Sequence, residues 1–127
     1  MPMKKLTILI LFLGLFSCGS SRTETKAVVV EPAEFQQKLQ KQEVQLIDVR
    51  TPEEFAEGHL EGAVNIDFLS EDFLEKVSKL NKRKPVMLYC RSGNRSGKAT
   101  IQLHDEGFRN ITDLKGGYQA WEEFIKE

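Results

Sequence analysis

Apolar residues alternate with polar segments along most of the chain in a pattern that predicts short strands separated by helices. Runs of β-branched and other apolar residues indicate strands, and they cover residues 27–30, 44–49, 63–66, 86–89 and 111–114. Apolar residues at helical spacing indicate helices, which cover residues 70–80 and stretches after Pro32, Thr51, the polar segment 91–97 and the glycine pair 116–117. This alternation is typical of an α/β fold.

Two segments define the architecture more closely. Thr51 is a predicted N-cap, Pro52 occupies the first helical position, Glu54 completes a capping box, and Gly58 ends this short helix. Residues 86–89 (VMLY) are apolar on both faces, as expected of a central parallel strand. We therefore predict a parallel sheet covered by helices on both faces, with any functional site at the carboxyl ends of its strands.

The N-terminal residues have a different character, which predicts an export signal. Lys4 and Lys5 precede an almost unbroken apolar run, residues 6–16 (LTILILFLGLF), and small residues follow it. A bilayer-spanning helix needs roughly 20 apolar residues, whereas this shorter run matches the apolar core of a secretory signal. A buried core helix is the alternative, and the lack of a polar face argues against it.

Residues 15–18 (LFSC) resemble a bacterial lipobox, in which a signal peptidase cuts before a cysteine that carries a diacylglyceryl group. We thus expect residues 1–17 to be a lipoprotein signal peptide, 18–26 a lipidated tether and 27–127 the folded domain. Several acyl chains on Cys18 would anchor the protein to a membrane surface without spanning it. The expected product is an exported lipoprotein facing the periplasm or the cell exterior; secretion with a free Cys18 is the alternative.

The composition fits one small domain with an ordinary core. The 127 residues include 18 Lys and Arg against 19 Asp and Glu, a net charge of −1. A balance so near zero argues against nucleic acid as a partner. His59 and His104 are the only histidines, and no pair of residues has the spacing of a metal site. We predict no metal and no nucleic-acid partner and, without a surplus apolar stripe, a monomer.

Cys90 is the candidate nucleophile. If Cys18 carries lipid, Cys90 is the only thiol of an exported protein, in which a pair of cysteines otherwise suggests a disulfide. Cys90 follows the predicted central strand and opens a loop into a helix, so backbone N–H groups can converge on its sulfur. The loop residues are Arg91, Ser92, Gly93, Asn94, Arg95 and Ser96. These N–H groups, the helix N-terminus and the two arginines should lower the thiol pKa; a buried structural cysteine is the alternative.

Four segments of the chain carry a family resemblance, namely residues 46–55 (LIDVRTPEEF), 58–66 (GHLEGAVNI), 86–96 (VMLYCRSGNRS) and 114–121 (LKGGYQAW). From about residue 29 to 125 the chain resembles a single-domain rhodanese, a thiosulfate or persulfide sulfurtransferase. The resemblance implies a rhodanese-like three-layer sandwich, with a five-stranded, mostly parallel sheet, helices on both faces and the Cys90 loop as active site. It also implies that Asp48 and Arg50 support this loop and that His59 lies in a surface turn.

The resemblance further implies a double displacement. The Cys90 thiolate would take the outer sulfur of thiosulfate, release sulfite, and pass the sulfur from a persulfide to a thiol or cyanide. The partners would be a small anionic sulfur donor and this acceptor, and no cofactor is implied. The Cys-x4-Arg spacing from Cys90 to Arg95 resembles the sulfurtransferase loop, whereas related phosphatases and arsenate reductases have one residue more. A non-enzymatic binding module is the other alternative.

Overall fold

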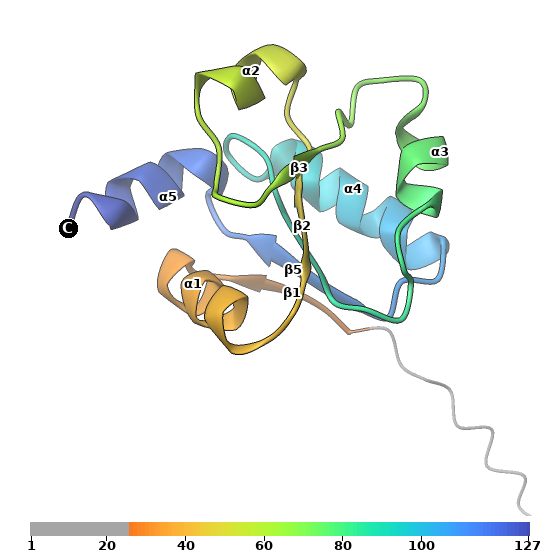
Figure 1. Ribbon diagram of the computed structural model, residues 1–127, viewed down its shortest axis with the longest axis horizontal. Coiled ribbons are helices and arrows are strands. Elements are labelled where there is room, and N and C mark those ends of the chain that lie inside the picture. The colour runs from red at the N-terminus through yellow and green to blue at the C-terminus, as the bar shows by residue number, and fades with distance from the viewer. Residues whose placement is uncertain (1–25) are drawn as a thin grey trace, which may run out of the picture.

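The computed structural model describes residues 26–127, which fold into alternating strands and helices (Figure 1). The predicted signal peptide, Cys18 and the tether up to residue 25 lie outside the described residues. The strands are β1 (Lys26–Val30), β2 (Gln45–Asp48), β3 (Val64–Asn65), β4 (Val86–Tyr89) and β5 (Asn110–Leu114). The helices are α1 (Pro32–Lys41), α2 (Pro52–Glu57), α3 (Phe73–Ser78), α4 (Asn94–Asp105) and α5 (Gly117–Ile125). Each strand and helix predicted from the sequence pattern is present.

The strands form one sheet in the order β1-β5-β4-β2-β3, and every neighbouring pair is parallel. The sheet is thus fully parallel, which is more regular than the mostly parallel sheet that we expected. β4 lies at its centre and is buried along its whole length, as its apolar residues predict. Because β2 and β5 flank β4, the carboxyl ends of these three strands lie at one edge of the sheet.

Helices cover both faces of the sheet, which confirms the three-layer sandwich. Helices α3 and α4 pack on one face through residues such as Phe73 and Leu103. Helices α1 and α5 pack on the other, where Phe35 meets Trp121 edge to face. Helix α2 lies over the carboxyl edge of the sheet (Figure 1). Within residues 26–127, none of the helices has the length and apolar character needed to cross a bilayer.

The start of α2 has the predicted capping box. The Glu54 N–H donates to Thr51 Oγ1 at 3.3 Å, and the Thr51 N–H donates to Glu54 Oε1 at 3.3 Å. Pro52 occupies the first helical position, where its missing N–H costs no hydrogen bond. The capping residues therefore determine where this helix begins.

The helix expected over residues 70–80 is shorter than predicted, because α3 covers only Phe73–Ser78. In the segment before it, the Leu69 N–H donates to Asp67 Oδ1 at 2.9 Å and the Ser70 hydroxyl donates to Asp72. Such local bonds to side chains compete with helical hydrogen bonds and favour a turn. Apolar periodicity alone does not detect this competition, so it overestimates the length of the helix.

Candidate active site

Cys90 lies where the sequence predicts it, directly after the central strand β4. Its side chain is only 1% exposed, and the Gly93 N–H donates to Cys90 Sγ at 3.0 Å. The loop then enters α4, whose first turn begins at Asn94. The sulfur is therefore held at the N-terminus of a helix, where backbone N–H groups favour negative charge.

The surroundings of Cys90 favour its thiolate. Burial by itself raises the pKa of the Cys90 thiol, because a charged sulfur loses hydration. Hydrogen bonds from the Ser96 hydroxyl and from the N–H groups of Ser96, Gly93 and Ser92 outweigh this effect, so the pKa lies below its ordinary value. A thiol of this kind can act as a nucleophile.

Arg95 forms an ion pair with a residue of α2 and is therefore not free to bind an anion. Its Nη1 and Nη2 atoms donate to Glu54 Oε1 and Oε2 at 2.7 and 3.0 Å. This bidentate contact with Arg95 lowers the pKa of Glu54 to about 2, although partial burial opposes the shift. The positive charge that the sequence places in the loop is therefore partly compensated, and the pair fastens α2 to the start of α4.

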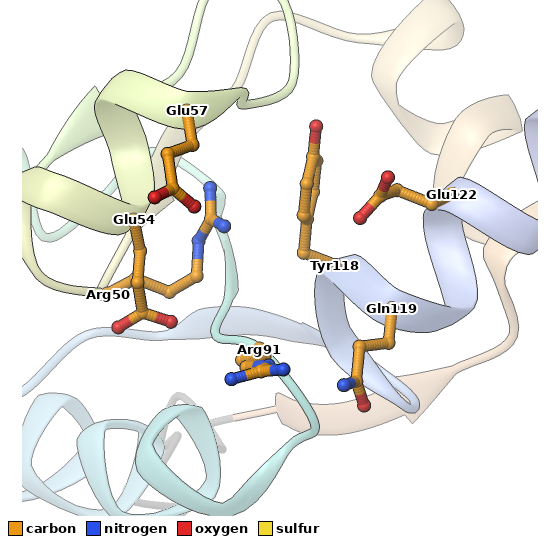
Figure 2. Close-up of a pocket in the computed structure, with 7 residues that line it drawn as sticks. All are labelled: Arg50, Glu54, Glu57, Arg91, Tyr118, Gln119 and Glu122. Carbon is orange, nitrogen blue, oxygen red and sulfur yellow. The ribbon is translucent and has the colours of Figure 1, made fainter.

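Arg91 has a different environment, since its exposed side chain borders a cavity of about 360 Å³. The cavity is lined by Arg50, Glu54, Glu57, Arg91, Tyr118, Gln119 and Glu122. Figure 2 shows the Arg91 guanidinium between the α2 side of this cavity and the α5 side. In the described part of the chain Arg91 forms no salt bridge. It is thus the loop cation available to an incoming anion.

Asp48 and Arg50 form a buried pair at the end of β2, beside the loop. Arg50 donates from Nε and Nη2 to the Asp48 carboxylate at 2.7–3.1 Å. Arg50 Nη2 also donates to the Gly58 carbonyl at 2.6 Å. The guanidinium carbon lies 4.2 Å from the centre of the Tyr118 ring, within range of a cation–π contact. This pair therefore joins β2, the end of α2 and the start of α5 around the cavity.

Helix α5 contacts the backbone of the cysteine loop directly, a contact that the sequence analysis missed. The Tyr118 N–H donates to the Cys90 carbonyl at 2.8 Å, and the Gln119 N–H donates to the Arg91 carbonyl at 3.1 Å. Gly117 has φ +62°, and a Cβ there would lie 2.5 Å from the Cys90 carbonyl oxygen. The glycine pair therefore does not only turn the chain. Glycine at position 117 also allows α5 to approach the cysteine loop this closely.

His59, expected in a surface turn, is exposed. It stacks on Phe55 with ring centroids 3.7 Å apart and contacts the Phe55 carbonyl.

Asp113, which the sequence analysis did not select, is only 4% exposed and lies in β5. The available signal was an acidic residue inside a predicted strand, residues 111–114 (ITDL). Among residues 26–127 no group of three or more His, Cys, Asp or Glu side chains is placed to hold a metal ion.

Comparison with known proteins agrees with this geometry. The model of the rhodanese-like domain family matches residues 31–124. Thiosulfate sulfurtransferase 18 of Arabidopsis thaliana is 37% identical over 114 residues, covering 80% of this chain and 84% of the relative. The chloroplastic thiosulfate sulfurtransferase 16 of the same plant is 42% identical over 85 residues, covering 59% of this chain and 71% of the relative. A rhodanese-related protein from Thermoplasma volcanium superposes with a TM-score of 0.67 at 29% identity, covering 76% of this chain and 91% of that chain. The chain therefore belongs to the rhodanese-like domain family.

Proposed function

We propose that this protein is a sulfurtransferase that carries a sulfane sulfur as a persulfide on Cys90. The observation that carries the proposal is the Cys90 sulfur itself, buried at a helix N-terminus with hydrogen-bond donors directed at it. Two relatives named thiosulfate sulfurtransferases support the same reaction. The donor is a small anionic sulfur compound, thiosulfate or a persulfide, and the acceptor is a thiol or cyanide.

The reaction proceeds in two displacements. In the first, the Cys90 thiolate attacks the outer sulfur of thiosulfate, a new S–S bond forms, and sulfite leaves with the electron pair of the bond that breaks. In the second, the acceptor attacks the outer sulfur of the Cys90 persulfide and restores the thiolate. Backbone N–H groups from Arg91 to Ser96 stabilise the negative sulfur at each stage.

The two arginines of the loop have different tasks in this scheme. Arg91, which borders the cavity, attracts the anionic donor and offsets charge on the departing sulfite. Arg95 keeps the loop in place through Glu54. Asp48 holds Arg50, which lines the cavity and binds the Gly58 carbonyl at the end of α2. None of these steps requires a metal or an organic cofactor.

The N-terminal sequence supports a proposal for where this reaction takes place. Residues 1–17 have the pattern of a lipoprotein signal peptide, and residues 18–26 connect the lipid site at Cys18 to the domain. We propose an exported, membrane-anchored monomer whose domain, residues 27–127, faces the periplasm or the cell exterior. Labelling cells with a radioactive fatty acid tests the anchor: wild type should incorporate the label and Cys18→Ser should not.

Intact-protein mass spectrometry tests the sulfur transfer. A soluble form beginning at Ser20 is measured before and after exposure to thiosulfate, with Cys90→Ser as the matched control. We expect a gain of about 32 Da, one sulfur atom, on the wild type alone, reversed by cyanide or a thiol. If thiosulfate, persulfide and polysulfide donors all leave no adduct, the sulfurtransferase proposal is wrong. Incubation with an aryl phosphate or arsenate then tests the oxyanion reactions.

A further inference from the structure

The amino edge of the sheet carries a concentration of positive charge that the proposed sulfur transfer does not use. Because every strand is parallel, the amino ends of the strands lie at the edge opposite the Cys90 loop. Residues 79–85 (KLNKRKP), which lead into β4, hold four cations and no acid. Six exposed cations lie at the start of β1 and in the segments that lead into β4 and β5. We call them the basic edge: Lys26, Lys79, Lys82, Arg83, Lys84 and Arg109.

Hydrogen bonds join the segments of the basic edge into one surface. The Lys26 N–H donates to the Arg109 carbonyl at 2.7 Å, and the Arg109 N–H donates to the Lys82 carbonyl at 3.4 Å. The Gln45 side chain, at the start of β2, donates to the Asn81 carbonyl and accepts from the Asn81 N–H, both at 2.8 Å. Figure 1 shows the start of β1 beside the connections from α3 to β4 and from α4 to β5, at the opposite end of the sheet from α2. The cations therefore share one surface, away from the cavity.

Few carboxylates offset this charge. Glu43 pairs with Lys84 at 3.8 Å, whereas Lys82, Arg83 and Arg109 form no salt bridge in the part of the chain that the structure describes. The cavity at the other edge is lined by three glutamates and two arginines. The domain is thus polarised, with positive charge at its amino edge, although the whole chain has a net charge of −1. The acidic residues in the connections of the amino edge are Glu43, Asp105 and Glu106.

The proposed lipid site is close to this edge in the sequence, which identifies the partner. The chain enters the described fold at Lys26, eight residues after Cys18. An extended chain of that length spans at most about 29 Å, roughly the width of a domain of this size. The basic edge therefore stays close to the membrane that holds the lipid. Anionic phospholipid headgroups complement its charge, and each Lys or Arg near such a surface strengthens binding about fivefold.

We propose that the basic edge docks on anionic phospholipid headgroups and orients the domain on the membrane. The inference rests on the proposed anchor at Cys18, which brings this edge to the bilayer. In this orientation the Cys90 loop and the cavity, at the opposite edge of the sheet, face away from the membrane. The sulfur donor and the acceptor therefore reach Cys90 from solution and not from within the bilayer.

Binding to vesicles tests the docking without the lipid anchor. The form beginning at Ser20 keeps the whole described fold, and it is sedimented with phosphatidylcholine vesicles that contain or lack phosphatidylglycerol. We expect it to bind only the vesicles with phosphatidylglycerol and to dissociate as salt is added. The double variant Lys82→Gln, Arg83→Gln should bind these vesicles at least about tenfold more weakly. The double variant Lys98→Gln, Lys115→Gln loses the same charge from exposed positions near the opposite edge, so it is the matched control and should bind like wild type.

Three results would overturn the proposal. The first is no binding to either kind of vesicle, and the second is equal binding by the two double variants. The third is duplex DNA displacing the protein from the vesicles at equal phosphate concentration, which would make this edge a nucleic-acid surface. None of these readouts involves Cys18 or sulfur transfer. The fatty-acid labelling and the mass spectrometry therefore test the anchor and the sulfurtransferase proposal separately.

A second measurement tests the orientation of the bound domain. In a Cys90→Ser background, a fluorophore is attached to Gln42→Cys, next to the partner of Lys84, or to Glu53→Cys on α2; both positions are exposed. Lipids with a quencher on the headgroup should quench the fluorophore at position 42 and leave the one at position 53 unchanged. Equal quenching at the two positions would mean that the domain binds in no fixed orientation and would also overturn the proposal.

Discussion

Arg91 and Arg95 lie in the same loop but differ in what their charges can do. The Glu54 carboxylate neutralises Arg95 at 2.7 Å, whereas Arg91, the residue after Cys90, borders the cavity. An exposed, unpaired guanidinium attracts an anion over a range set by the ionic strength. Sequence alone does not distinguish the two residues, because the partner of Arg95 is 41 positions away in the chain.

Replacing Arg91 with Gln should weaken donor binding without preventing sulfur transfer. We expect the KM for thiosulfate to rise about two- to fivefold, as for the loss of an exposed charge worth about 0.4–1 kcal/mol. The difference should shrink as salt is added, because salt screens exposed charges. Steady-state kinetics at two ionic strengths measures it. Lys98→Gln, an exposed cation on α4, is the control and should behave like wild type; an equal rise in KM there would assign the effect to net charge.

Three helices meet at the cysteine loop, and each contributes a different contact. The N-terminus of α4 stabilises charge on the sulfur, and α5 donates two backbone hydrogen bonds to the loop carbonyls. Helix α2 adds the Glu54–Arg95 ion pair, whose side chains are 25% and 21% exposed. The loop is therefore held by elements that are distant in sequence, so its shape depends on how the helices pack on the sheet.

Breaking the ion pair between α2 and α4 should loosen this arrangement. Glu54→Gln keeps the shape of the side chain but removes its charge, and we expect a loss of about 1–2 kcal/mol in the free energy of unfolding, discounted for partial exposure. Sulfur transfer should slow because the loop is less well held. Urea unfolding and a thiosulfate–cyanide assay measure the two effects. Glu53→Gln, one position earlier and exposed, is the matched control. A Glu54→Gln protein as stable and active as that control would refute the role of the pair.

At the scale of the whole molecule, local signals predict more than long-range ones. The strands, the capping box of α2 and the buried central strand follow from periodicity and local hydrogen bonding, which are visible in a short window of sequence. The position of Cys90 after that strand follows from the same reasoning. The five-stranded sheet and the support by Asp48 came from the family resemblance, and the strand order was not predicted, because pairing between distant strands has no local signature. The contact of α5 with the loop and the burial of Asp113 were missed for the same reason.

Asp113 and Glu54 should also shape the pH dependence of the stability of the whole domain, with opposite signs. Glu54 has a lowered pKa of about 2, so its contribution is present above its ordinary value of 4.5 and is lost as the pH falls through 2. Asp113 has a raised pKa of about 6, so its contribution is present below its ordinary value of 3.8 and is lost as the pH rises through 6. That shift of about two pH units corresponds to at most about 3 kcal/mol.

Asp113→Asn should therefore gain stability relative to wild type as the pH rises. Because Asn does not ionise, the variant avoids burying a charge at neutral pH, and the difference in the free energy of unfolding should move toward the variant by up to about 3 kcal/mol between about pH 4 and pH 7. Urea unfolding of both proteins at intervals across this range measures the difference. Asp105→Asn, an exposed carboxyl at the end of α4, is the control and should follow wild type. Parallel curves for Asp113→Asn and wild type would mean that the buried carboxyl titrates alike in the folded and unfolded chains, since only a difference in bound protons makes stability depend on pH.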